Sequence, residues 1–168
     1  MSTGMPDVIS PVQLRAAGLD DMDIAAALFR EYAAGLGISL AYQNFEDELE
    51  SLPGAYAPPK GALLLADIGG EAMGCVAVRP LHATNFCEMK RLYVRERARG
   101  TGAGRALAEA AIAEGRRMGY AAMRLDTLST MKAALSLYRA LGFREIPAYY
   151  ETPIAGTVFM HRDLEGAG

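Results

Sequence analysis

The chain has 168 residues, 51% of them hydrophobic and 22% charged, with a formal net charge of −3 at pH 7. This size predicts one domain, which we place at residues 10–164, between an N-terminal extension (1–9) and a C-terminal tail (165–168). The acidic balance argues against a nucleic-acid binder, and the absence of a long apolar run or a signal-peptide pattern favours a cytoplasmic protein that does not enter a membrane.

The first half of the chain predicts a short strand, two helices and a hairpin. The strand falls within residues 8–17, and Asp20 or Asp21 is placed to cap the following helix. Residues 44–52 (NFEDELESL) predict a second, short and acidic helix. Residues 62–81 read as two strands, because the Gly69-Gly70 pair favours a tight hairpin turn.

The second half alternates strands and helices. Strands are predicted at 86–94, 121–127, 143–150 and 155–164. The Ala-rich segment 104–119 predicts a helix that stops at Gly119, and a further helix, capped by Ser129 or Thr130, ends at Gly142. The resulting order β-α-α-β-β-β-α-β-α-β-β predicts a mixed α/β domain.

A glycine-rich segment, Arg99-Gly-Thr-Gly-Ala-Gly104, lies where a strand ends and a helix begins. Free backbone N–H groups and the positive end of a helix dipole meet at such a position, so a diphosphate is the natural ligand. The flanking residues are basic over 90–105, in an otherwise acidic chain. A purely structural glycine turn is the alternative.

Two other phosphate-binding motifs fit less well. A Walker P-loop ends in Gly-Lys-Ser/Thr, whereas this segment continues with Arg105-Ala106. A dinucleotide fold requires GxGxxG directly after a strand and an acidic residue about 20 positions later. Asp126 meets the second requirement, but the spacing here is GxGxG, and four residues (RERA) separate the strand from the glycines.

The pattern Arg99-x-x-Gly102-x-Gly104, preceded by RLYV and followed by RAL, resembles the acetyl-CoA signature of the GCN5-related N-acetyltransferase (GNAT) family. The later LYRALGF (137–143) resembles that family's penultimate helix, and the likeness extends over roughly residues 10–164. The resemblance implies a mixed, mostly antiparallel sheet flanked by helices, with splayed central strands. It also implies acetyl-CoA as the acetyl donor, without a metal.

The same resemblance implies a cofactor site. The backbone of Leu92, Tyr93 and Val94 is expected to bind the pantetheine arm, with the Leu92 amide at the thioester carbonyl. The expected diphosphate-binding residues are Arg99, Gly100, Thr101, Gly102, Ala103, Gly104 and Arg105. The family's frequent asparagine seven residues before its tyrosine is Met131 here, which lacks the amide.

Acetyl transfer to an amine requires a neutral amine, a donor for the oxyanion and a proton for the departing sulfur. Tyr138, in the LYRALGF motif, is the expected general acid by resemblance. Glu88 is the candidate general base and Asp126 the alternative base, although either carboxylate could instead pair with a nearby arginine. Strand alternation predicts that Glu88, Lys90 and Leu92 share one face.

The expected function is transfer of an acetyl group from acetyl-CoA to a primary amine of a small molecule, amino acid or peptide, in a monomer or homodimer. The alternative is a catalytically silent acyl-CoA-binding sensor or assembly module. The acidic helix could attract a cationic amine, with Tyr42, Tyr149 and Tyr150 as walls, or be an ordinary solvated face. Cys75 and Cys87 show no metal-ligand spacing and are expected to be buried free thiols.

Overall fold

The computed structural model describes residues 11–164, so the predicted extension and tail, and the start of the first predicted strand, lie outside the described residues. The strands are β1 (Val12–Ala16), β2 (Ala62–Ile68), β3 (Glu71–Pro80), β4 (Phe86–Val94), β5 (Ala122–Leu128), β6 (Arg144–Ile146) and β7 (Thr157–Asp163). The helices are α1 (Met22–Leu36), α2 (Phe45–Glu50), α3 (Ala103–Arg117) and α4 (Lys132–Ala140), with 3-10 turns at 19–21, 41–43, 54–56 and 96–98.

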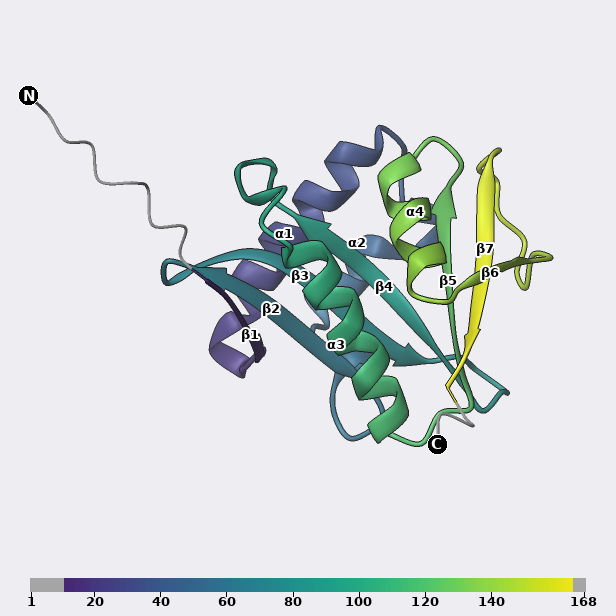
Figure 1. Ribbon diagram of the computed structural model, residues 1–168, viewed down its shortest axis with the longest axis horizontal. Helices are drawn as coiled ribbons and strands as arrows, with labels where there is room; N and C mark the ends of the chain where they lie inside the picture. The colour runs from purple at the N-terminus through teal and green to yellow at the C-terminus, as the bar shows by residue number, and fades with distance from the viewer. Residues whose placement is uncertain (1–10, 165–168) are drawn as a thin grey trace, which may run out of the picture.

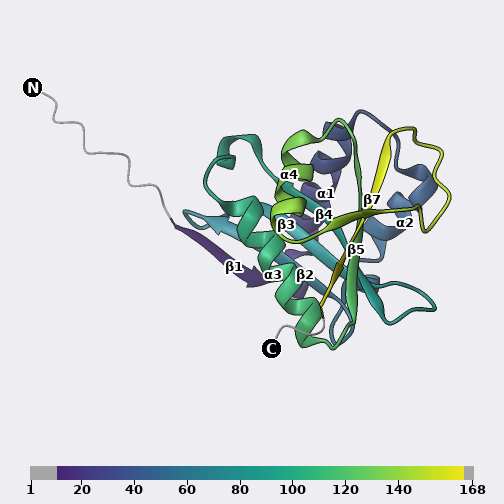
Figure 2. The same cartoon turned by 45° about the vertical axis from the view of Figure 1, so that its right-hand side comes forward.

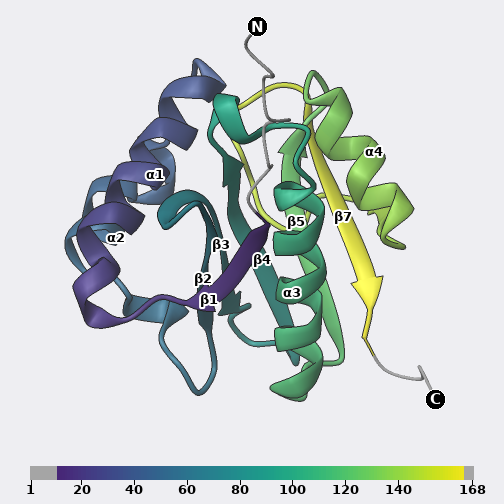
Figure 3. The ribbon, with the colours of Figure 1, turned by 60° about the vertical axis from the view of Figure 1, so that its left-hand side comes forward.

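The strands form one sheet in the order β1-β2-β3-β4-β5-β7-β6 (Figure 1). All neighbours are antiparallel except β4 and β5, which are parallel. Helices α1 and α2 cover one face and α3 and α4 the other, as seen from the side in Figure 3. The predicted order of elements and the mixed, mostly antiparallel architecture are confirmed. None of the helices in residues 11–164 is long and apolar enough to cross a bilayer.

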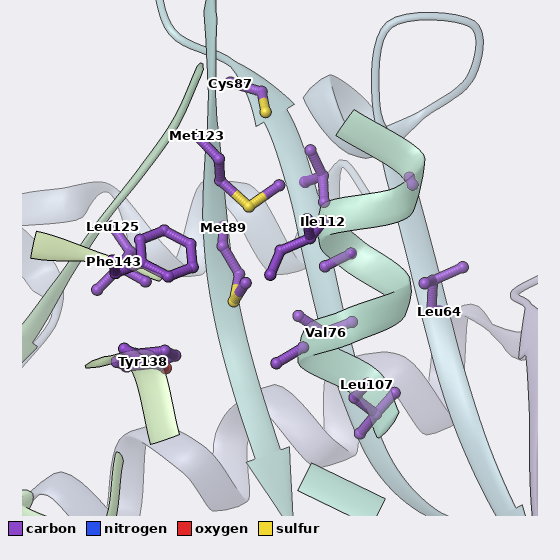
Figure 4. Close-up of a cluster of buried hydrophobic side chains, with 14 of the residues drawn as sticks. Leu64, Val76, Cys87, Met89, Leu107, Ile112, Met123, Leu125, Tyr138 and Phe143 are labelled. Atoms are coloured by element: carbon purple, nitrogen blue, oxygen red, sulfur yellow. The ribbon is translucent and has the colours of Figure 1, made fainter. Parts of the chain in front are cut away.

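Each face of the sheet carries its own hydrophobic core, because side chains alternate along the strands. On β2, Leu64 and Ala66 join the core beneath α3, whereas Leu63 and Leu65 join the core beneath α1. Figure 4 shows the α3-side core, in which side chains from the strands meet those of α3 and α4. Burying each large aliphatic side chain contributes about 1.5–3 kcal/mol. Cys75 and Cys87 are free and buried, as predicted.

Strand β4 contains a β-bulge that its sequence pattern did not predict. Lys90 pairs with Ala77, and Tyr93 pairs with Cys75, so the two residues between them stand opposite the single residue between their partners. Arg91, one of these two residues, has a φ of 62°, a conformation that non-glycine residues rarely adopt. The bulge inserts one residue and reverses the alternation of side chains beyond it.

The prediction that Glu88, Lys90 and Leu92 share a face is therefore wrong. Met89 belongs to the α3-side core, so its neighbours Glu88 and Lys90 point to the opposite face. Beyond the bulge, Leu92 packs against the α3-side core. One strand thus presents polar groups to one face and a hydrophobic side chain, two residues later, to the other.

Strands β4 and β5 separate after their first residues. Their pairing runs only from Phe86–Ala122 to Glu88–Arg124, although β4 continues to Val94 and β5 to Leu128. In Figure 1 the two strands start together at the lower end of the sheet and diverge toward the top, where α4 follows β5. The predicted splayed central strands are confirmed.

Several local predictions need correction. Helix α4 begins after Met131 without a side-chain cap, so neither Ser129 nor Thr130 caps it. The carboxylate of Asp21 accepts from the Gly18 amide and Arg15 rather than from an amide of α1. The ends of α3 and α4 were predicted correctly, since Gly119 and Gly142 have φ angles of +86° and +91°.

The predicted strand at 143–150 is also too long, because β6 ends at Ile146. The next residue, Pro147, has no N–H to donate to a neighbouring strand. The chain then leaves the sheet in the connection to β7, which runs outward in Figure 2. This departure places Tyr149 and Tyr150 over the central strands rather than in the sheet.

Candidate active site

A cavity of about 460 Å³ occupies the opening between β4 and β5. Helix α1 closes one side and α4 the other. Its lining residues come from these four elements and the segments next to them: Tyr32, Gly35, Leu36, Met89, Lys90, Arg91, Leu92, Tyr93, Val94, Arg99, Asp126, Thr127, Met131, Lys132, Ala133, Ala134, Leu137 and Tyr138. Six of the site residues predicted from the sequence therefore line one cavity: Leu92, Tyr93, Val94, Arg99, Asp126 and Tyr138.

The β4 wall of this cavity carries backbone groups that the sheet does not use. Tyr93 and Val94 pair with β3 on one side only, because β5 has already diverged. Leu92 has a register partner on neither neighbouring strand, since the bulge removes it from the β3 ladder. An unpaired strand edge of this kind can hydrogen-bond an extended, amide-containing ligand.

The glycine-rich loop presents a group of free amides. The backbone amides of Gly100, Thr101, Gly102, Gly104 and Arg105 donate to no group within residues 11–164. The Ala103 amide is bonded to the Thr101 hydroxyl at 3.3 Å. A Cβ added to Gly100 or Gly102 would meet no atom within 4 Å, so open space lies above these glycines. This arrangement fits an anionic diphosphate at the start of α3.

Most of the arginines around this loop are already paired. Arg95 bonds Glu31 at 2.8 Å, Arg97 bonds Glu71 at 2.5 Å, and Arg105 bonds Glu109 at 2.8 Å. Arg99 differs: it lines the cavity, its Nε donates to the Val94 carbonyl, and no ion pair joins it to the described acids. Of these four arginines near the glycine-rich loop, only Arg99 therefore keeps a charge that no described acid neutralises.

Tyr138 extends from α4 into the cavity. Only 7% of the residue is exposed, its ring packs edge-on against Phe143, and Figure 4 shows it at the edge of the α3-side core. Its hydroxyl makes no hydrogen bond to any residue that the structure describes. Burial raises the pKa of Tyr138, so the phenol keeps its proton at neutral pH. The group is a proton donor with no competing partner.

Met131 also lines the cavity, at the start of α4. The Thr127 hydroxyl points to its sulfur, with oxygen and sulfur 3.7 Å apart. The thioether supplies an apolar surface where an asparagine would supply hydrogen bonds.

A second cavity of about 370 Å³ is lined by residues of β4, β5 and the connection that follows β6, with Tyr149 and Tyr150 among them. Lys90 lines both cavities, so they meet at this residue. The lysine is 6% exposed, and its Nζ lies 3.7 Å from a carboxylate oxygen of Asp126. Burial lowers the pKa of Lys90, because the charged ammonium loses its hydration.

Glu88 and Asp126 occupy different positions. Glu88 is 1% exposed and lies in the second cavity, where both oxygens are engaged: one by Arg79 at 2.9 Å and the other by the Tyr149 hydroxyl at 2.5 Å. Asp126 lies in the first cavity with Tyr138, and one of its oxygens accepts from the Tyr150 hydroxyl at 2.6 Å. Its other oxygen accepts no hydrogen bond from residues 11–164.

The acidic helix α2 is partly neutralised within the fold. Glu48 bonds the buried guanidinium of Arg91 at 2.9 Å, and the Tyr56 hydroxyl donates to the same carboxylate at 2.7 Å. Glu46 lies 3.4 Å from Arg30. These pairs hold α2 against β4, so Glu48 in particular is not available to attract a cationic amine.

Two basic residues that line the second cavity, Lys90 and Arg124, were not predicted as site residues. A signal for Arg124 was present: it precedes Asp126 by two positions in a mostly apolar strand, so both project from one face. Lys90 was masked by its place in a basic segment, where a solvated side chain is the ordinary interpretation.

The family model described as "Acetyltransferase (GNAT) family" matches residues 25–143. The chain belongs to the GNAT acetyltransferase family. An uncharacterized N-acetyltransferase of Schizosaccharomyces pombe is 41% identical over 145 residues, which cover 86% of this chain and 89% of that protein. The resemblance seen in the sequence is thus confirmed, and this GNAT protein is an acetyl-CoA-dependent N-acetyltransferase.

Solved structures agree on the fold. A GNAT acetyltransferase of Staphylococcus aureus superposes with a TM-score of 0.76 at 18% identity, covering 92% of this chain and 99% of that one. The PaiA N-acetyltransferase of Thermoplasma acidophilum, solved in complex with coenzyme A, gives a TM-score of 0.68 at 18% identity over 90% of this chain and 98% of its own.

Proposed function

We propose that this GNAT protein transfers an acetyl group from acetyl-CoA to a primary amine, with the coenzyme in the opening between β4 and β5. The observation that carries the proposal is the buried Tyr138 hydroxyl, unbonded within the described residues, in a cavity walled by unpaired backbone of β4. Acetyl-CoA brings an activated thioester carbonyl and a thiol leaving group.

Each group of residues that lines the site has a separate role in the proposed reaction. The amides of the 100–105 loop and Arg99 hold the diphosphate, and the Leu92 amide donates to the thioester oxygen. Tyr138 donates its proton to the departing sulfur, which a phenol with a raised pKa does only as the sulfur becomes basic. The amine enters from the second cavity, past Lys90.

We assign proton removal from the amine to Asp126 rather than Glu88. Asp126 shares the first cavity with Tyr138 and keeps one oxygen open, whereas both oxygens of Glu88 are already held.

Replacing Tyr138 by Phe tests the proposal. Because only the hydroxyl is lost, kcat should fall about 100-fold or more, while the Kd for coenzyme A stays within about twofold of the wild-type value. Both are measured by thiol release across a panel of amines and by calorimetric titration. Tyr120→Phe is the matched control, since its hydroxyl bonds the Lys60 carbonyl and it lines neither cavity. Unchanged kcat in Tyr138→Phe would remove the assigned role.

A further inference from the structure

The second cavity is lined by three cationic side chains, Arg79, Lys90 and Arg124, and by two acids, Glu88 and Glu151. Arg79 is paired with Glu88, and Lys90 lies near Asp126. Glu151 is exposed, and no ion pair joins it to the described residues. The remaining cation is Arg124, which projects into the cavity from β5 with no acidic partner within residues 11–164.

Arg124 is held as a rigid fork. Its guanidinium carbon lies 4.7 Å from the ring centre of Phe86 and 5.3 Å from that of Tyr149, so it is stacked against both aromatic side chains. Its Nε lies 3.1 Å from Nδ1 of His161, whose Nε2 lies 2.8 Å from Asp163. A bond to Asp163 places the ring proton on Nε2 and leaves Nδ1 as the acceptor that Arg124 requires.

The two terminal nitrogens of this fork are unused. They donate to no group among the residues that the structure describes, and they are not buried without a partner, so they face the open cavity. A guanidinium stays charged at all physiological pH values and matches a carboxylate in a bidentate geometry. A fixed, partly buried fork with two free N–H edges is the arrangement that recognises a carboxylate.

The position of Arg124 relative to Asp126 sets the size of the ligand. The two residues are separated by one position on β5 and project from the same face, which places their Cα atoms about 7 Å apart. A ligand that hydrogen-bonds two side chains so close on one strand is small, with its amine and its carboxylate separated by only a few covalent bonds. Lys90, which lines both cavities, stands at the passage between them.

We propose that the acceptor is a small amino acid, whose carboxylate is bound by Arg124 while its amine reaches the acetyl group. This inference rests on the proposed function and narrows it. Peptide N-termini and simple amines lack a carboxylate close to the amine, so Arg124 has nothing to bind in them.

The test compares amino acids with their own carboxamides as acceptors, in the wild type and in Arg124→Gln. The wild type should favour the acid over its carboxamide by about 10- to 100-fold in kcat/KM for the preferred side chain, as expected for a charge-assisted bidentate contact. In Arg124→Gln, kcat/KM for the acid should fall by that factor, mainly through KM. The value for the carboxamide should change less than about threefold.

Two further variants make the result specific. Arg117→Gln removes an equivalent charge from the exposed end of α3, outside both cavities, and should keep the wild-type preference. Arg124→Lys keeps the charge but not the fork, and should lower kcat/KM for the acid about tenfold with the carboxamide unaffected. It also serves if Arg124→Gln loses activity toward both acceptors through unfolding.

The outcomes separate the two proposals. If the wild type acetylates carboxamides, polyamines or peptides as well as any amino acid, or if Arg124→Gln keeps the preference, the amino-acid inference is overturned and the proposed function stands. If no amine of any class is acetylated while coenzyme A binds, the proposed function fails and the inference falls with it.

Discussion

Two carboxylates, Glu88 of β4 and Asp126 of β5, belong to the central strands. They differ in how many of their oxygens already accept hydrogen bonds. Arg79 and the Tyr149 hydroxyl occupy both oxygens of Glu88, which makes it a structural anchor for the β6–β7 connection. Asp126 accepts a hydrogen bond from the Tyr150 hydroxyl at 2.6 Å, and the Lys90 ammonium lies farther away, at 3.7 Å. The positions of the two residues on their strands do not show which one is the general base. Their hydrogen-bond partners distinguish them.

The pH dependence of kcat/KM distinguishes the two carboxylates. A general base acts only when deprotonated, so the rate falls as the pH drops below its pKa. We expect Asp126→Asn to lower kcat/KM about 100-fold and to lose this acidic fall, because Asn cannot take up a proton. Glu88→Gln should keep the acidic fall, even where it lowers the rate by disturbing Tyr149. The reverse pattern, with the acidic fall lost only in Glu88→Gln, would assign the base to Glu88.

At the level of elements, the sequence predicted which segments form strands and helices, but it did not predict the β-bulge in β4. The period-two pattern of FCEMKRLYV identifies the strand, and its bounds agree with the structure. The bulge leaves no trace in that pattern, because an inserted residue is stabilised by long-range contacts. The Arg91 side chain bonds Glu48 and lies 5.2 Å from the Phe45 ring centre, and both partners belong to α2.

Dependence on long-range contacts also explains which contacts of the site were not predicted. The motif residues 99–105 and 137–143 are local in sequence and could be found there. The contacts of Tyr149 with Glu88, Tyr150 with Asp126, and Arg124 with His161 join residues 24 to 61 positions apart. Such contacts depend on the strand order β4-β5-β7, and a sequence pattern of local spacing does not encode it.

Gly104, at the start of α3, allows the effect of the glycine loop on coenzyme binding to be separated from its effect on stability. Gly104 lies in the first turn of the helix, and a Cβ there would meet only Val94, at 3.8 Å, an ordinary contact. Gly104→Ala should therefore leave the protein as stable or up to about 1 kcal/mol more stable, because alanine favours a helix. The added methyl group would crowd the diphosphate, so the Kd for coenzyme A should rise at least about tenfold.

Thermal unfolding with and without ligand checks both halves of this prediction. Coenzyme A at 100 times the wild-type Kd adds about 2.7 kcal/mol to the free energy of unfolding, which raises the wild-type Tm by about 5–10 °C. The same concentration should raise the Tm of Gly104→Ala by about half as much or less, because a tenfold higher Kd leaves about 1.4 kcal/mol of the added free energy of unfolding. An equal shift in both proteins would show that the glycine loop is not in contact with the coenzyme.

At the scale of the whole molecule, the site exists because two differently built halves of the sheet meet at β4 and β5. One half, β1 to β4, is antiparallel and carries the core beneath α1 and α2 on one face. The other half, β5 to β7, follows α3 and twists away after three paired residues. Each half satisfies its own backbone, and the opening between them leaves one edge of β4 free for a ligand.

A crystal structure of the protein with acetyl-CoA or coenzyme A tests this central claim most directly. We predict that the pantetheine arm lies between β4 and β5 beside Leu92, Tyr93 and Val94, with the diphosphate on the amides of residues 100–105 and the sulfur within reach of the Tyr138 hydroxyl. A coenzyme bound elsewhere on the molecule, with β4 and β5 paired along their whole length, would contradict it.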